Sequence, residues 1–236
     1  GAAYVFRFDG TSWNEQKLGS GGYRGAYGHS VSIDNTTVAV GERGSDRVVI
    51  YKFNGALFEK AQELVDGTYP VVRFGASVAI AGDTMVIGAP WAHASQRVGS
   101  ASVYHFNDAA WEFQNKIWAS DGTDEAYFGG SVAICDGDTI VIGAPTYAPS
   151  WTPSLGKAYT FTRNGNEWQQ DQILRASDGG AGNFFGHDVA CFGSTIVIGA
   201  PNTFSTLTVD VRDREDYGGR AYVFEKNTVV GPWTEQ

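Results

Sequence analysis

The sequence predicts an all-β protein built from one four-stranded antiparallel unit that is repeated along the chain, which is the organisation of a β-propeller. Two observations lead to this prediction. A β-hairpin that begins with an aromatic residue and glycine and mostly ends with Gly-Ala-Pro occurs four times, and a second strand pair that opens on Tyr-x-Phe occurs five times. The two pairs alternate, and four strands per roughly 50 residues is typical of one propeller blade.

The hairpin is clearest at Phe128–Pro145, FGGSVAICDGDTIVIGAP. Val132 and Ile134 alternate with smaller residues, Asp136-Gly137-Asp138 supplies turn chemistry, and Ile140-Val141-Ile142 is a short apolar run. Two similar copies lie at residues 74–90 and 185–201, and a less regular copy lies at 27–42. The apolar residues on both faces of these strands require each sheet to pack between neighbouring sheets.

The second strand pair fixes the period. Its first strands carry Tyr4 and Phe6, Tyr51 and Phe53, Tyr104 and Phe106, Tyr159 and Phe161, and Tyr222 and Phe224. The five phenylalanines are 47, 53, 55 and 63 residues apart. The glycines that lead into Gly-Ala-Pro or its equivalent (Gly41, Gly88, Gly143 and Gly199) are 47, 55 and 56 residues apart. No segment keeps a period of about 3.6, so the sequence predicts almost no helix.

These units give a single domain over residues 1–236. We expect a half-blade at 1–18 and full blades at 27–64, 74–117, 128–174 and 185–236. Because a closed propeller needs whole blades, the count of four and a half predicts a segment of a larger propeller. A five-bladed ring with one half-blade is the alternative.

Charge and hydropathy exclude several classes of partner. The formal net charge is −9, with 17 Lys and Arg residues against 26 Asp and Glu residues. We therefore expect no nucleic-acid partner, because phosphate binding needs clustered positive charge. No run of about 18 apolar residues is present, so no membrane insertion is expected. No signal peptide is visible, and we expect one to have been removed or to lie outside this sequence.

The repeated residues, namely Phe-Gly, Ser-Val-Ala-Ile, Val-Ile-Gly-Ala-Pro and Gly-x-Ala-Tyr-Val-Phe, resemble the FG-GAP repeat of integrin α-subunit propellers and related surface proteins. The resemblance covers essentially the whole chain. It implies a propeller of typically seven blades that is extracellular or at the cell surface. It also implies a role in adhesion or ligand binding rather than catalysis.

The hairpin turns depart from the calcium-binding form of that repeat. Calcium needs several closely spaced oxygen ligands, which Asp-x-Asp-x-Asp-Gly supplies in such repeats. The turns here, at residues 34–36, 82–84, 136–139 and 193–195, contain at most two carboxylates each. The sequence therefore predicts no metal in them, and no motif indicates a cofactor.

The two cysteines belong to different repeats. Cys191 aligns with Ile134, whereas Cys135 is one residue further along and therefore points to the opposite face of its sheet. Packed sheets lie about 10 Å apart, and a disulfide needs Cα atoms about 4.4–6.8 Å apart. We therefore expect two buried free thiols, with a bond between repeats as the alternative.

Repeated polar residues are interpreted as structural. Asp66, Asp121 and Asp178 stand in acidic turns before each Phe-Gly, where they could form a ring of carboxylates but are more simply explained as turn residues. His29 and His187 follow the glycine at one repeat position, so they are not interpreted as a catalytic pair.

Loops that vary between repeats are the better candidates for ligand binding, because the scaffold does not need them. The connections after each Gly-Ala-Pro leave from the same strand end, so we expect them to share one rim of the propeller. Their candidate ligand-binding residues are Trp91, His93, Tyr147, Trp151, Phe204, Asp210, Arg212, Asp213, Arg214 and Asp216. Aromatic anchors with a polar rim are typical of recognition surfaces, although the same residues could simply cover their own loops.

The leading hypothesis is a non-catalytic, extracellular binding or adhesion module whose loops contact a protein or a glycan. One alternative is a propeller enzyme that acts on polysaccharide, which would need two carboxylates about 5–9.5 Å apart. The other is a purely structural segment of a larger surface protein. No catalytic residue is assigned, because the serines and histidines lack a nucleophile motif.

Overall fold

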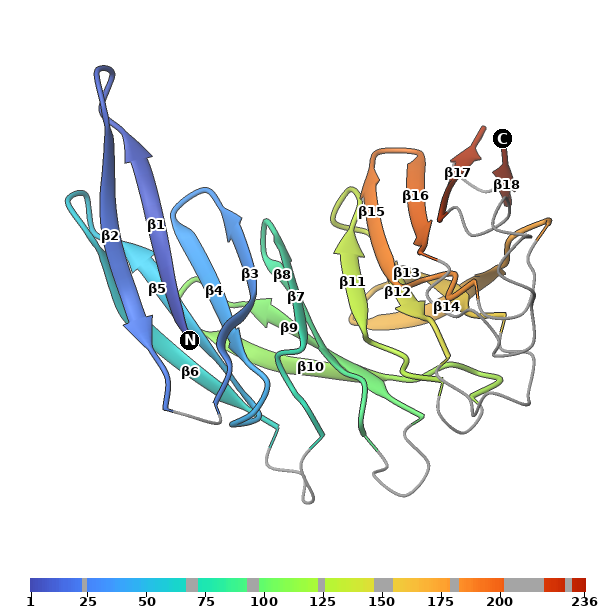
Figure 1. Cartoon of the computed structure of the whole chain (residues 1–236), viewed down its shortest axis with the longest axis horizontal. Helices are drawn as coiled ribbons and strands as arrows, with labels where there is room; N and C mark the ends of the chain where they lie inside the picture. The colour runs from blue at the N-terminus through green and yellow to red at the C-terminus, as the bar shows by residue number, and fades with distance from the viewer. Residues whose placement is uncertain are drawn as a thin grey trace, which may run out of the picture.

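The computed structural model shows an arc of separate antiparallel sheets, one half-blade followed by four full blades (Figure 1). It describes residues 1–22, 25–66, 72–92, 98–122, 126–146, 155–178, 183–201, 219–227 and 231–236. Within these ranges all regular structure is strand, and no helix is present that could cross a membrane. The predicted all-β propeller architecture is therefore confirmed.

The half-blade consists of β1 (Ala2–Phe8) and β2 (Trp13–Ser20). Each full blade runs in chain order from the inner to the outer edge of the arc. The strands of blade 1 are β3 (Tyr27–Asp34), β4 (Thr37–Glu42), β5 (Arg47–Phe53) and β6 (Phe58–Val65). Those of blade 2 are β7 (Ser77–Ala81), β8 (Thr84–Ala89), β9 (Ser100–Phe106) and β10 (Trp111–Ile117).

Blade 3 contains β11 (Ser131–Ile134), β12 (Thr139–Ala144), β13 (Lys157–Asn164) and β14 (Glu167–Leu174). Blade 4 contains β15 (Asp188–Phe192), β16 (Thr195–Ala200), β17 (Arg220–Lys226) and β18 (Trp233–Glu235). The register repeats from blade to blade, since Val78 faces Ile87 in blade 2 and Val132 faces Ile142 in blade 3. The repeated hairpins predicted from the sequence are thus the inner strand pairs.

Alternation along each strand sends one set of side chains to the preceding blade and the other set to the following blade. Ile87 and Tyr104 of blade 2 pack against Val48 and Ile50 of blade 1 in one buried cluster. Val103, the neighbour of Tyr104 on β9, points to the opposite face of the sheet and joins the cluster shared with blade 3. Because blades 2 and 3 are covered on both faces, their second strands, β8 and β12, are buried along their whole length, whereas the outermost strands carry exposed polar residues.

The Gly-Ala-Pro and Phe-Gly motifs meet at each boundary between full blades. A Cβ added at Gly88 of blade 2 would lie 2.0 Å from the carbonyl oxygen of Gly129 in blade 3. A Cβ added at Gly41 or Gly143 would be similarly close to the next blade, at 2.2 Å from the Gly75 carbonyl oxygen and 2.0 Å from the Gly186 carbonyl oxygen. Ser77 Oγ donates a buried hydrogen bond of 2.9 Å to the same Gly129 oxygen. Glycine is therefore required here so that the backbone of the next blade can approach.

Glutamine side chains connect the outer strands. The Gln62 side chain of blade 1 both accepts from the Trp111 N–H and donates to the Trp111 carbonyl of blade 2, each at 2.8 Å. Gln172 makes the same pair of bonds to Trp233, at 2.9 and 2.8 Å. The aromatic residue that starts each outermost strand is thus held by the preceding blade.

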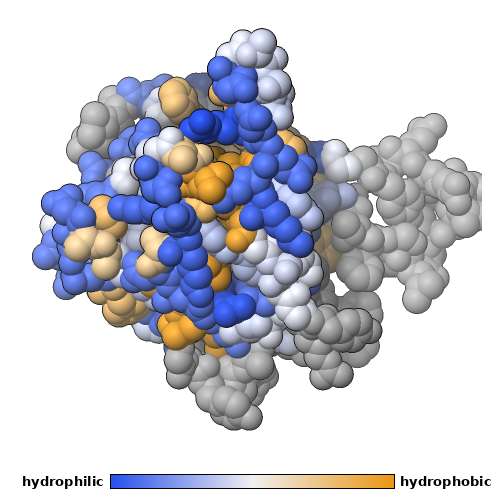
Figure 2. Space-filling model, turned by 90° about the vertical axis from the view of Figure 1, so that its left-hand side faces the viewer, coloured by the Kyte–Doolittle hydropathy of each residue, from blue (hydrophilic) through white to orange (hydrophobic). Residues whose placement is uncertain are grey.

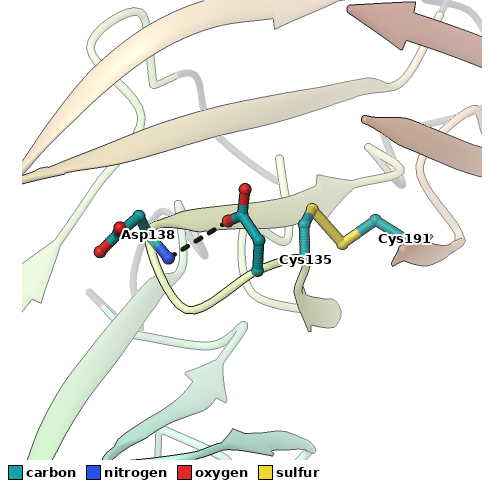
Figure 3. The surroundings of a disulfide bond; sticks show 4 residues. Cys135, Asp138 and Cys191 are labelled. Atoms are coloured by element: carbon teal, nitrogen blue, oxygen red, sulfur yellow. Dashed lines mark hydrogen bonds between the residues drawn. A yellow bond between two sulfur atoms is a disulfide. The ribbon is translucent and has the colours of Figure 1, made fainter. Parts of the chain in front are cut away.

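The cysteines form a disulfide between blades 3 and 4, so the expectation of two free thiols is wrong (Figure 3). The Cα atoms of Cys135 and Cys191 are 5.0 Å apart. The expected spacing of about 10 Å fails because Cys135 directly follows the innermost strand β11 and Cys191 lies on the innermost strand β15, where neighbouring blades converge. In the repeat, Cys135 and Cys191 point to opposite faces of their own sheets. A bridge between blades 3 and 4 requires this, because one face of blade 3 packs against the opposite face of blade 4.

The beginning of the arc exposes an apolar face. Tyr4 and Phe6 of β1 are 49% and 54% exposed, whereas the equivalent Tyr51 and Tyr104 are buried. Val31 and Ile33 of β3 are exposed beside them, because no inner strand pair lies next to β1 in this structure. Figure 2 shows this side of the molecule, with apolar atoms grouped between polar ones. Blade 4 exposes Phe192 at the opposite end.

Candidate functional site

The same four-residue turn begins every full blade. Its first residue has a left-handed backbone, with φ of 53° at Ala26, 59° at Arg73, 55° at Tyr127 and 53° at Phe184. Its carbonyl accepts a hydrogen bond of 3.0–3.1 Å from the N–H of the fourth residue (His29, Ala76, Gly130 and His187). The middle residues are a buried aromatic residue and a glycine with positive φ. Packing therefore fixes the middle of the turn and leaves its two ends free to vary.

The ends of these turns surround a pocket of about 440 Å³ where the four blades converge. The turns contribute His29, Arg73, Ala76, Tyr127, Gly130 and His187, and the strand ends beside them contribute Arg43, Pro90, Trp91 and Pro145. We call this the axial pocket. All four full blades line it, so the pocket exists only because the repeats are arranged around a common centre.

The axial pocket is positively charged, although the chain as a whole is acidic. Arg43 and Arg73 line it together with two histidines, and none of its described lining residues is a carboxylate. Partial burial lowers the pKa of His29, and the charges of Arg43 and Arg73 lower it further. Arg43 and Arg73 therefore carry the positive charge of the pocket, and they would attract an anion that entered it.

The aromatic and cationic side chains of the pocket also stack. The guanidinium carbon of Arg73 lies 3.2 Å from the centre of the Trp91 ring, which is a cation–π contact. Trp91 and Tyr127 are half-buried, and Pro90 and Pro145 are buried. The pocket therefore combines flat apolar surfaces with positive charge.

Residues at φ near +55° are strained unless they are glycine, at a cost of about 1–3 kcal/mol each. Arg73 and Tyr127 are both in this conformation and both line the pocket. Such strained residues cluster at binding and catalytic sites, where the surrounding structure holds them in place. Ala26 and Phe184 have the same conformation without lining the pocket, so the strain belongs to the repeated turn, which places Arg73 and Tyr127 at the pocket.

Among the candidate ligand-binding residues from the sequence, Trp91 lines the axial pocket. The other candidates lie outside the described residues, namely His93, Tyr147, Trp151, Phe204, Asp210, Arg212, Asp213, Arg214 and Asp216. Sequence reasoning missed Arg43 and Arg73. It placed Tyr127 on the same rim as the loops but not among the candidate ligand-binding residues, and it interpreted His29 and His187 only as a repeat position. The variation at both ends of the Phe-Gly turn is the signal that could have found Arg73, Tyr127 and the histidines, whereas Arg43 follows β4 and has no such signal.

The aspartates of the acidic turns connect blades. Asp121, which follows blade 2, accepts hydrogen bonds from Lys157 Nζ at 2.7 Å and Tyr159 Oη at 2.8 Å in blade 3. Asp178 accepts equivalent bonds from Arg220 and Tyr222 of blade 4, each at 2.7 Å. Their role is structural, as interpreted, but their partners belong to the next blade rather than to their own turn.

The first of these aspartates borders a second cavity. Asp66 is bonded to Lys116 Nζ at 2.7 and 2.9 Å, and both line a space of about 310 Å³ between blades 1 and 2. Burial first and the Asp66 charge second raise the pKa of the adjacent Tyr104 to about 12. Because Asp66 and Lys116 neutralise each other, this cavity is a weaker candidate for ligand binding than the axial pocket.

Comparison with solved structures supports the fold. The β-propeller domain of Myceliophteria thermophila Cps50 (Swd1) superposes with a TM-score of 0.54 at 8% identity, covering 84% of this chain and 59% of that one. Saccharomyces cerevisiae Sqt1 gives a TM-score of 0.46 at 14% identity, covering 75% of this chain and 46% of that one. The chain thus spans 59% or less of the length of each of these two solved chains. At these identities the likeness concerns the fold alone.

Comparison with curated sequences gives no match. Comparison with protein families does, since residues 71–104, 111–161 and 168–224 each match the FG-GAP repeat. These segments carry the Gly-Ala-Pro strands and the Phe-Gly turns whose contacts join the blades, and together they cover more than half of the sequence. The chain belongs to the FG-GAP repeat family.

Proposed function

We propose that this FG-GAP propeller is a non-catalytic, extracellular binding module that contacts a protein or a glycan through its axial pocket. One observation carries the proposal. The pocket is lined by the variable ends of one repeated turn in all four blades, whereas the middle of that turn is the buried scaffold. A repeated scaffold that varies only where side chains meet a common pocket is suited to recognition.

Two further features support this role. The pocket has the size and the mixture of aromatic and charged groups that are typical of small-ligand sites. The Cys135–Cys191 disulfide supports an extracellular location, because such bonds persist mainly in oxidising compartments. The alternative of an enzyme that acts on polysaccharide gains less support, since the described lining offers two arginines and two histidines but no carboxylate.

The proposal is tested by screening the purified chain against arrays of glycans and extracellular matrix proteins. The Ala76→Trp variant fills the axial pocket from a turn end whose equivalents in other blades are the histidines His29 and His187. The matched control is Ala56→Trp, on an exposed outer turn. We expect Ala76→Trp to abolish binding and Ala56→Trp to leave it unchanged. A ligand that binds both variants as well as the native chain would refute a role for the pocket.

A further inference from the structure

The charge of the axial pocket narrows the class of ligand. Four basic side chains, His29, Arg43, Arg73 and His187, converge from blades 1, 2 and 4. Elsewhere in the described residues, arginines that approach other groups are usually bound to carboxylates, as Arg47 is to Glu42 and Glu63. Between the residues that the structure describes, Arg43 makes no hydrogen bond or ion pair. A basic site of this kind in a chain of net charge −9 is suited to an anion.

The walls of the pocket narrow the class further. Trp91, Tyr127, Pro90 and Pro145 give it flat apolar surfaces beside the cations. Inorganic phosphate or sulfate has no apolar surface to place against them. A sugar ring that carries an acidic group has both an apolar ring face and an anion, and Arg binds carboxylates and similar oxyanions through two parallel hydrogen bonds.

We infer that the axial pocket binds a saccharide that carries an acidic group, either a carboxylate or a sulfate. This inference rests on the proposed function, because it names the ligand class of the same site. The acidic group lies between Arg43 and Arg73, and the sugar ring lies against the half-buried Trp91 and Tyr127 side chains. Because the pocket opens at the centre of the arc, it takes one unit of the saccharide, with the rest of the chain extending outward.

The test is a calorimetric titration of the native chain with four probes. These are a galacturonate trisaccharide, a sulfated galactose trisaccharide, a neutral galactose trisaccharide and a glutamate-containing tripeptide. We expect one or both acidic saccharides to bind, more weakly as salt is added, and the neutral saccharide and the peptide to bind at least tenfold more weakly. The two acidic arms show whether the anion is a carboxylate or a sulfate.

Two variants assign the binding to the pocket. Arg43→Gln removes one charge without breaking a described contact, and we expect it to weaken binding of the acidic saccharide by roughly tenfold or more, the effect of a charged hydrogen bond. Arg7→Gln is the matched control, because Arg7 is exposed on the half-blade, where its guanidinium lies over the Phe53 ring. Arg7→Gln should bind as the native chain does, and thermal unfolding should show that both variants fold.

The outcomes separate the inference from the proposed function. Equal binding of the neutral saccharide, binding of the peptide alone, or unchanged binding by Arg43→Gln would overturn the acidic-saccharide inference. If no saccharide binds but another ligand is lost in Ala76→Trp, the inference fails and the proposed function stands. If no ligand responds to Ala76→Trp, both fail.

Discussion

Replacing Gly88 by alanine perturbs the contact that joins blade 2 to blade 3. The added Cβ would lie 2.0 Å from the Gly129 carbonyl oxygen and 2.3 Å from Ser77 Oγ. Real Cβ atoms essentially never approach other heavy atoms within 3.0 Å, so the two backbones must separate by about 1 Å. That movement also stretches the buried hydrogen bond from Ser77 Oγ to Gly129.

The cost follows from these two effects. Overpacking of this kind costs about 1–3 kcal/mol, and a weakened buried hydrogen bond adds about 1 kcal/mol. We therefore expect Gly88→Ala to lower the free energy of unfolding by about 2–4 kcal/mol. For a chain of this length that lowers Tm by roughly 4–16 °C.

Gly199→Ala is the matched control, since it changes the same motif position in blade 4. Its added Cβ would have no neighbour closer than 3.7 Å, because no blade packs against that face in the structure. We expect a change of at most about 0.5 kcal/mol. Urea and thermal unfolding, followed by circular dichroism, measure both variants. Equal effects of the two substitutions would refute the idea that Gly-Ala-Pro glycines admit the following blade.

Three further predictions concern other contacts between blades. Replacing both Cys135 and Cys191 by alanine should lower the free energy of unfolding by about 4 kcal/mol, because the disulfide closes a loop with a sequence separation of 56 residues and so reduces the entropy of the unfolded chain. An unchanged urea midpoint would contradict this. Burial alone would raise the pKa of Asp121, but the hydrogen bonds from Lys157 and Tyr159 outweigh it and hold that pKa below its ordinary value. Asp121→Asn should therefore destabilise the chain at pH 7 by an amount that shrinks below about pH 4, and a pH-independent loss in unfolding titrations would count against the ion pair. Gln62→Ala removes two hydrogen bonds to the Trp111 backbone and should lower the free energy of unfolding by about 1–2 kcal/mol. Gln169→Ala, at an exposed position, is the control and should leave the urea midpoint unchanged.

Much of the fold could be predicted from the sequence because each repeat shows the same local pattern, so the copies support one another's assignment. The alternation in Phe128–Pro145 and the spacing of the Tyr-x-Phe pairs are properties of single strands, and four copies reduce the chance of misreading any one of them. The structure places these segments in β11–β13 and their equivalents, as expected.

Contacts between blades were harder to predict because they depend on how closely neighbouring sheets approach. The prediction of free thiols at Cys135 and Cys191 assumed one distance between packed sheets along their whole length, whereas neighbouring blades come closer together toward their innermost strands. The partners of Asp121 lie 36 and 38 residues further along the chain, at Lys157 and Tyr159, and a turn motif carries no information about them.

The axial pocket was missed for a related reason. Arg43, Arg73 and Tyr127 are far apart in the sequence, and each appears as an ordinary residue in its own repeat. Only the circular arrangement of the blades brings the turn ends and the end of β4 together. The loops after Gly-Ala-Pro drew attention because they vary in length, whereas the turn ends vary only in residue type.

The account depends most on the claim that recognition takes place where the four Phe-Gly turns meet. A crystal structure of the chain bound to a ligand returned by the array screen tests this most directly. We predict electron density for the ligand between turns of at least two blades, in contact with Arg43 or Arg73. Density confined to the outer strands or to the exposed face of β1, with the centre of the arc empty, would contradict the account.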